Sequence, residues 1–258
     1  MKQDTRLWEI DLLRGVAVLG MITYHLAFDL SYFNVADIGL HAALWTMVGR
    51  ATASVFVFLV GVSLSLSYSR LKLKGGETKK TRRYLLRGLK IFLYGVVITA
   101  VTWFFLDEDF VLFGILHLIG SSIILSIPLL DEKPRTLFFA GILLACFFII
   151  PPSFLLTESH WLIWLGFPPQ GFSSVDYAPL LPWYGIVLLG LSAGKKLYPG
   201  YERRIALPDY SRNKAVLFLC MLGRNSLFIY FIHQPIMLSI MYLLGLGELA
   251  RLFDILKP

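Results

Sequence analysis

The sequence is dominated by seven long apolar stretches that short polar segments separate. The stretches cover residues 12–30, 46–67, 86–106, 110–130, 135–152, 177–198 and 215–246. Apolar runs of about 18 residues or more are long enough to span a bilayer as helices. Solidly apolar runs, without a ~10-residue alternation, also argue against a transmembrane barrel. We therefore predict an all-α fold: one polytopic helical membrane bundle over residues 1–258, with about seven transmembrane helices.

Two features of the last stretch predict an interruption of its helix. Gly223, Arg224 and Asn225 follow one another near its beginning, and Pro235 lies further along. Proline removes a backbone hydrogen bond and clashes with the preceding turn, so it kinks a helix. We expect a break at 223–225 and a kink at Pro235.

The composition supports a membrane protein. Hydrophobic residues make up 57% of the chain, charged residues only 16%, and the mean hydropathy is +0.68. A soluble domain carries about 25% charged residues. The two cysteines, Cys146 and Cys220, lie in apolar stretches and indicate neither a disulfide framework nor a metal site.

Lysine and arginine are distributed unevenly between the loops, which predicts the orientation in the membrane. The basic residues before stretch one, between stretches two and three, after stretch four and after stretch six are Lys2, Arg6, Arg70, Lys72, Lys74, Lys79, Lys80, Arg82, Arg83, Arg87, Lys90, Lys133, Arg135, Lys195, Lys196, Arg203, Arg204, Arg212 and Lys214. Loops 31–44, 107–109 and 153–176 contain none. We therefore expect a cytoplasmic N-terminus and a C-terminus outside, in a prokaryotic cell membrane. Topology explains the net charge of +7, so nucleic acid is not a predicted partner.

The first apolar stretch carries three ionisable residues, Arg14, His25 and Asp29. Arg14 and His25 are 11 positions apart, about 16 Å along a helix and close to three whole turns, so they share one face. Charged groups at membrane depth usually face a protein-lined or water-filled interior and mark a functional path. Asp29 follows His25 by one turn and is expected to orient its imidazole.

Further polar residues interrupt the fourth and the last stretch. They are His117 in the fourth, and Arg224, Asn225, His233 and Gln234 in the last. We expect the three histidines of these stretches to share one layer, above a cationic inner mouth formed by the arginines. Alternatively, the histidines only bond neighbouring helices and the arginines only snorkel to the interface.

Imidazole is the natural general base near neutral pH. The sequence contains no G-x-S-x-G elbow, no Walker loop and no clustered Cys/His signature, so we predict no metal ligand. The basic segment with Lys79, Lys80, Arg82 and Arg83 would either attract anionic lipid or receive a polyanionic cytosolic ligand.

Five segments together resemble a known family. They are RLWEIDLLRGVAVLGMITYH at the beginning, FVFLVGVSLSLS, FGILHLIG, DYAPLLPWYGIVLLG and LGRNSLFIYFIHQP. Their order resembles the transmembrane acyltransferases related to heparan-α-glucosaminide N-acetyltransferase, and most closely their short prokaryotic relatives. The R-x10-H spacing of Arg14 and His25 is also similar to the wider superfamily of membrane acyltransferases that acylate sugars.

The resemblance implies transfer of an acyl group, with acetyl favoured, from cytosolic acetyl-CoA or another acyl-CoA. The acceptor would be a glycan, amine or hydroxyl compound on the other side of the membrane. We expect Arg14, Lys79, Lys80, Arg82, Arg83 and Arg224 to bind the phosphates of acyl-CoA, with His117, Asn225, His233 and Gln234 further along the same site. A homodimer is compatible with the sequence but not required by it.

The family leaves two candidates for the base. Its lysosomal member has asparagine at the position of His25 and a catalytic histidine in an H-x-x-W-N-G stretch. Here His41 and Trp45 are spaced H-x-x-x-W, and the asparagine-glycine is missing. In the wider superfamily the histidine at the position of His25 is catalytic. We therefore favour His25 as the base, oriented by Asp29, and keep His41 as the alternative.

Two other function classes fit buried histidines. A b-type haem or quinone protein would use His25, His41, His117 and His233 as ligands, and a haem would give an absorption band near about 400–430 nm. A proton-coupled transporter would use them as a relay, and would show substrate flux without acyl-CoA. The lack of an internal repeat argues mildly against a transporter.

Overall fold

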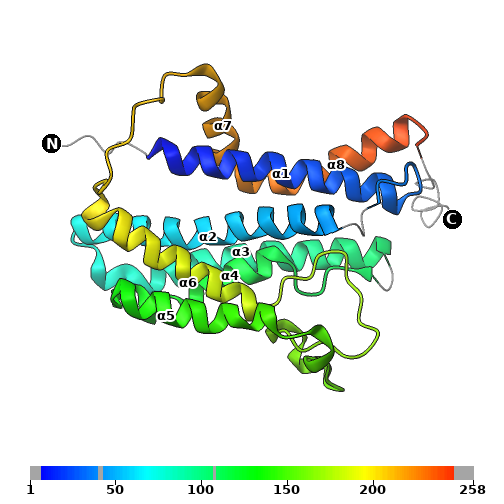
Figure 1. Cartoon of the computed structure of the whole chain (residues 1–258), viewed down its shortest axis with the longest axis horizontal. Coiled ribbons are helices and arrows are strands. Elements are labelled where there is room, and N and C mark those ends of the chain that lie inside the picture. Colours follow the sequence, from blue (N-terminus) through cyan, green and yellow to red (C-terminus); the bar gives the residue numbers. More distant parts are fainter. Residues whose placement is uncertain (1–6, 40–42, 107–108, 247–258) are drawn as a thin grey trace. The chain divides into compact units, whose positions relative to one another are not determined.

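The computed structural model describes residues 7–39, 43–106 and 109–246. This part of the chain forms helices and no β-strand (Figure 1), so the predicted all-α class is confirmed. The helices are α1 (Trp8–Tyr32), α2 (Ala43–Leu73), α3 (Lys80–Leu106), α4 (Ile115–Leu125), α5 (Pro134–Ala145), α6 (Leu180–Leu197), α7 (Lys214–Arg224) and α8 (Ser226–Leu243). Shorter 3-10 turns include η1 (Glu77–Lys79), η3 (Pro128–Asp131), η4 (Cys146–Ile149) and η6 (His160–Leu165).

Within the described part of the chain, four helical segments are long and apolar enough to cross a membrane: Trp8–Tyr32, Leu44–Leu73, Glu77–Leu106 and Ser226–Leu243. α3 shows why such a helix suits lipid, because large apolar side chains point outward along its length. Leu93, Val97 and Trp103 are all more than half exposed. The chain is thus an integral membrane protein by composition and helix length, whereas seven spans and the orientation of the termini stay predictions.

Several predicted stretches form shorter helices than the hydropathy pattern indicates. The stretch 110–130 yields α4, whose 11 residues rise only about 16 Å. The stretch 135–152 yields α5 and the 3-10 turn η4. The last stretch divides into α7 and α8 at Asn225, where a break was predicted. Pro235 lies inside α8 without ending it.

The chain divides into two compact units. The first unit contains α1, the beginning of α2 up to Phe56, α7 and α8. The second contains the rest of α2 with α3 to α6. The predicted single domain over 1–258 stays a prediction.

Glycine lets α1 and α7 approach closely in the first unit (Figure 1). A Cβ at Gly15 of α1 would lie 2.0 Å from the carbonyl oxygen of Leu219, and one at Gly223 of α7 would lie 1.9 Å from that of Asp11. Each helix therefore presents a glycine to the other's backbone. Small residues at such crossings are how membrane helices gain packing contacts without a hydrophobic driving force.

The second unit repeats this device at three crossings. Gly61 of α2 lies against Gly190 of α6, Gly88 of α3 against Gly120 of α4, and Gly141 of α5 against Gly185 of α6. Around these crossings lies a buried core that includes Leu64, Leu118, Leu188 and Leu191. The helices of this unit are therefore ordered by glycine approaches and leucine packing together.

The helix ends follow from local chemistry. The Asn213 side chain accepts hydrogen bonds from the backbone N–H groups of Ala215 and Val216, at 2.9 and 3.4 Å, and caps the beginning of α7. α2 ends in a Schellman arrangement, in which the Gly76 N–H bonds the Leu71 carbonyl and Gly75 takes a φ of +64°. These signals place the breaks between elements where the sequence supplies turn residues.

Candidate active site

The centre of the candidate site is a pair of histidines, His25 of α1 and His233 of α8. Their ring centroids are 5.1 Å apart, with an angle of 58° between the ring planes. Tyr24 and Tyr230 flank the pair, with ring centroids 5.9 Å from His25 and 5.7 Å from His233. Two residues more than 200 positions apart in the sequence thus form one aromatic and basic cluster.

The hydrogen bonds of His233 define which of its nitrogens is available. Nδ1 lies 2.7 Å from the carbonyl oxygen of Tyr230 and 3.1 Å from that of Ile229. Only an N–H can bond a carbonyl oxygen, so in the neutral ring Nδ1 carries the hydrogen and Nε2 carries the lone pair. Nε2 is buried, and no described residue supplies a partner for it.

Asp29 and Gln234 form a second pair, with Asp29 one turn beyond His25 on α1 and Gln234 directly after His233 on α8. Gln234 donates from Nε2 to Oδ1 of Asp29 at 2.7 Å. The side chain of Asp29 is buried, with only 1% of its surface exposed. Oδ2 of Asp29 and Oε1 of Gln234 are buried without a hydrogen-bond partner among the described residues. Oδ1 of this carboxylate is thus bonded to Gln234, and the orienting role expected for Asp29 toward His25 stays a prediction.

Helical spacing explains why these four side chains converge. His25 and Asp29 are four positions apart on α1 and therefore lie on one face. On α8, His233 and Gln234 are adjacent, so each side chain reaches one member of the α1 pair. The arrangement leaves three buried acceptor atoms, Nε2, Oδ2 and Oε1, unsatisfied, which is costly in a low-dielectric interior.

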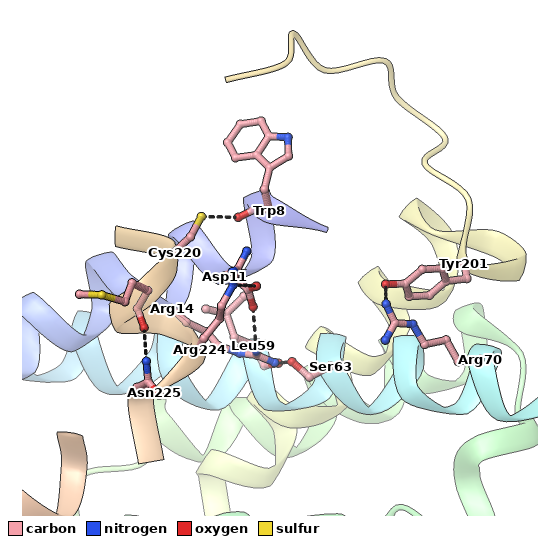
Figure 2. A network of polar contacts seen from close by, with 11 residues as sticks. Trp8, Asp11, Arg14, Leu59, Ser63, Arg70, Tyr201, Cys220, Arg224 and Asn225 are labelled. Atoms are coloured by element: carbon pink, nitrogen blue, oxygen red, sulfur yellow. Dashed lines mark hydrogen bonds and ion pairs between the residues drawn. The ribbon is translucent and has the colours of Figure 1, made fainter. Parts of the chain in front are cut away.

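Arg14 and Arg224 lie together, but an acidic residue compensates them (Figure 2). Arg224 donates from Nε to Oδ2 of Asp11 at 3.0 Å, and Arg14 donates from Nη1 to Oδ1 at 3.3 Å. Asp11 itself is only 3% exposed. One carboxylate thus joins α1 to α7, and the cationic inner mouth expected from the sequence contains a buried anion.

Asn225 connects α7 to α8 and forms hydrogen bonds with both helices. Its side-chain Nδ2 donates to the Met221 carbonyl at 2.9 Å (Figure 2). Its own carbonyl accepts from the N–H of Ile229. The residue therefore satisfies the last turn of one helix and begins the next. Its predicted contact with acyl-CoA stays a prediction.

His117 lies in the second unit, near the beginning of α4. Its ring stacks on Phe113 at 5.4 Å and meets Phe92 edge-on at 4.9 Å, and Nδ1 accepts from the Gly114 N–H at 3.3 Å. Asp176 completes this helix start by accepting from the N–H of Ile115. These contacts are those of a packed, capping histidine, and a common layer with His25 and His233 stays a prediction.

The basic segment around α3 also lies in the second unit. Lys79 is at the end of η1, and Arg82 and Arg83 are exposed on the first turn of α3. Lys80 differs, because it is paired with Asp131 of η3. The phosphate-binding role predicted for these four residues remains untested, and Lys80 would have to exchange an existing partner.

The alternative base, His41, lies outside the described residues. Among the described residues no group of three or more His, Cys, Asp or Glu side chains could hold a metal ion. Sequence reasoning missed Asp11, although its i,i+3 spacing to Arg14 was a visible signal. It also missed the pairing of Gln234 with Asp29, which no local pattern announces.

One comparison with known proteins decides the family. A family model described as heparan-alpha-glucosaminide N-acetyltransferase, catalytic, matches residues 6–235 of the 258. The chain belongs to this family. Curated proteins and solved structures give no match.

Membership in the N-acetyltransferase family identifies the chain as an acetyltransferase-like membrane transferase. The matched segment includes both histidines of the pair, together with Asp29 and Gln234. The buried polar cluster between α1 and α8 therefore belongs to the part of the chain that defines the family.

Proposed function

We propose that this protein is a membrane-embedded acyltransferase with its reaction centre at the His25–His233 cluster. It would move an acyl group, acetyl in the first instance, from cytosolic acyl-CoA to a sugar, amine or hydroxyl acceptor on the extracytoplasmic side. His25 would act as the general base. The supporting observation is the set of buried, unsatisfied acceptor atoms beside His25, in a chain of the N-acetyltransferase family.

The proposed chemistry follows from what the cluster contains. His25 takes a proton from the acceptor N–H or O–H as the nitrogen or oxygen forms its bond to the thioester carbonyl carbon. The carbon–sulfur bond then breaks, and the CoA thiolate receives the proton from the imidazolium of His25. The products are the acylated acceptor and free CoA, and His25 returns to its neutral state. A positioned imidazole contributes about 10²- to 10⁴-fold to such a reaction.

The polar atoms beside the base favour an acyl-acceptor substrate that carries several hydrogen-bond donors. The amide Oε1 of Gln234 accepts hydrogen bonds, and so does Oδ2 of Asp29 when this residue is ionised. Both atoms therefore suit the hydroxyl or amino groups of a sugar. The donor substrate would come from the cytoplasmic side, and the exposed Arg82 and Arg83 are proposed to bind its phosphates.

The haem alternative gains no support from this geometry. The rings of His25 and His233 are in direct contact, unlike two axial ligands with a porphyrin plane between them.

The test is acyl transfer by the purified protein in liposomes. Acetyl-CoA labelled in the acetyl group is supplied on one side and a panel of amino sugars and polyols on the other. The wild type should label an acceptor, and His25→Ala should reduce the rate by about 10²-fold or more. Leu26→Ala, an exposed neighbour on α1, is the matched control and should retain the rate. Wild-type turnover in His25→Ala would remove His25 from the mechanism.

Binding is measured separately from turnover. A ligand that binds the native state raises the melting temperature. His25→Ala should therefore keep the shift that acetyl-CoA produces in the wild type. A variant that loses both the shift and the turnover would indicate a binding role for His25 and would contradict its assignment as the base.

A further inference from the structure

We propose that His233 orients His25, and accepts a hydrogen bond from it through Nε2 when His25 becomes protonated. The inference rests on the proposed function, since it assigns a positioning residue to that reaction. It gives His233 the part that a carboxylate plays in a Ser-His-Asp arrangement. The sequence had placed Asp29 in this part.

Backbone hydrogen bonds fix the tautomer of His233. Its Nδ1–H is held by the carbonyl oxygens of Tyr230 and Ile229, at 2.7 and 3.1 Å. These bonds lie within one helix, so they persist as long as α8 does. Nε2 is consequently a lone pair of constant direction, in a side chain that is 8% exposed. A buried acceptor without a partner is stabilised by any donor that comes within reach.

The position of the His25 ring also favours a hydrogen bond to His233. At a centroid separation of 5.1 Å, a rotation of the His25 side chain can bring a ring nitrogen to hydrogen-bond distance, about 2.9 Å, from Nε2. A neutral His25 has one N–H and one lone pair. If the N–H points to His233, the lone pair is left for the acceptor substrate.

Among the described residues Asp29 forms no hydrogen bond to the His25 ring. Its Oδ1 accepts from Gln234 at 2.7 Å, and its Oδ2 is buried without a partner there. In the described structure the side chain in ring contact with His25 from the facing helix is therefore His233, not a carboxylate.

The proton balance is simple. When the acceptor substrate gives its proton to the free nitrogen of His25, the ring becomes an imidazolium with two N–H groups. The second N–H donates to Nε2 of His233 and stabilises the positive charge. No proton moves onto His233. When CoA thiolate leaves, it takes the transferred proton, and the pair returns to its starting state.

Other titratable groups surround the pair and enter any pH dependence. Tyr24 and Asp29 face it from α1, and Tyr230 faces it from α8. α7 contributes Arg224, which pairs with Asp11. Among the contacts of the part of α2 in this unit, Thr52 meets Gly20 and Gly49 meets Tyr24, neither of them titratable. The pair loses activity on the acid side, because a proton already bound to His25 leaves this ring without a lone pair for the proton of the acceptor substrate.

The activity test compares two variants of His233 with a control on the same helix. His233→Phe keeps a ring but no acceptor, and we expect kcat to fall about 10²-fold with an unchanged KM for acetyl-CoA. His233→Gln restores an acceptor oxygen that does not titrate, and should recover kcat to about tenfold below the wild type. Ser239→Ala, at an exposed position of α8, should retain the wild-type rate. Equal loss in both His233 variants would overturn the proposal.

The pH profile separates positioning from a structural role. In the wild type Nε2 of His233 stabilises a protonated His25, so the acid limb of the rate should lie at higher pH than in His233→Phe, which has no acceptor atom. His233→Gln keeps an acceptor oxygen and should return the acid limb toward that of the wild type. An acid limb at the same pH in the wild type and in His233→Phe contradicts the proposal.

A spectroscopic measurement tests the pair without turnover. In ¹⁵N-histidine-labelled wild type in lipid, lowering the pH to protonate His25 should move Nε2 of His233 to the shift of a hydrogen-bonded acceptor. An Nε2 signal that stays unbonded would refute the pair, even in an active enzyme. A bonded Nε2 in a protein that transfers no acyl group would instead refute the proposed function alone.

Discussion

The crossing of α1 and α7 gives the sharpest prediction on stability. Gly15→Ala adds a methyl group at a point where its carbon would lie 2.0 Å from the carbonyl oxygen of Leu219. Ordinary carbon–oxygen contacts begin at about 3.4 Å, so the two helices would have to separate by roughly 1.4 Å at this point. The obstacle is backbone, which cannot rotate away. The substitution therefore acts on the whole crossing.

The expected magnitude combines two effects of opposite sign. Overpacking a closely packed contact costs about 1–3 kcal/mol. Alanine in place of glycine inside a helix returns up to about 1 kcal/mol. Backbone atoms block the added carbon, so the upper end of the overpacking cost applies and the net destabilisation of Gly15→Ala should be about 2 kcal/mol. Thermal unfolding in detergent, followed by tryptophan fluorescence, should show a melting temperature several degrees below the wild type.

A matched control lies five residues away on the same helix. A Cβ at Gly20 would meet Oγ1 of Thr52 at 2.9 Å, and a threonine side chain can rotate away. Gly20→Ala gains the same helix propensity without the backbone clash, so it should be neutral or slightly stabilising. An unchanged melting temperature in Gly15→Ala, or an equal loss in Gly20→Ala, would refute the close backbone contact of α1 and α7.

Two further substitutions test the charged contacts. Asp11→Asn leaves Arg14 and Arg224 without their shared buried carboxylate and should lower the free energy of unfolding by about 1–2 kcal/mol. The value is reduced because both arginine side chains are partly exposed. An unchanged melting temperature would show that these ion pairs do not stabilise the protein. Hydrogen bonds from Lys80 and then Tyr68 hold the pKa of Asp131 well below its usual range. The ionised Asp131 therefore stabilises the folded protein fully at pH values above the unfolded pKa of about 3.9. This stabilisation is lost as the pH falls toward the folded pKa. Melting temperatures of wild type and Asp131→Asn should therefore differ at neutral pH and converge below about pH 4, whereas a constant difference would contradict the assignment.

The sequence predicts the helical membrane class because long apolar runs have few other uses. It predicts helix lengths less well, because hydropathy does not distinguish a helix that spans a bilayer from one that packs in a protein core. α4 illustrates this, since its beginning is fixed by Gly114 and by Asp176 from a loop 61 residues away. Such a cap depends on tertiary structure and leaves no local pattern.

The candidate site is also only partly predictable from the sequence. The polar residues of α1 and α8 are conspicuous in the sequence because their stretches are otherwise apolar. Their partners are less visible: Asp29 at i+4 from His25 suggests a pair, but Gln234 on the facing helix takes the carboxylate instead. Which side chain of α8 meets which of α1 depends on the rotation of two helices about their axes, and hydropathy does not encode it.

The central claim is that the buried cluster between α1 and α8 carries out acyl transfer. The most direct measurement is a single-turnover experiment with labelled acetyl-CoA and an amino sugar in liposomes that contain either wild type or His25→Ala. The account predicts labelled acceptor with the wild type, and about 10²-fold slower labelling with the variant while acetyl-CoA still binds. Equal labelling by both proteins would contradict it.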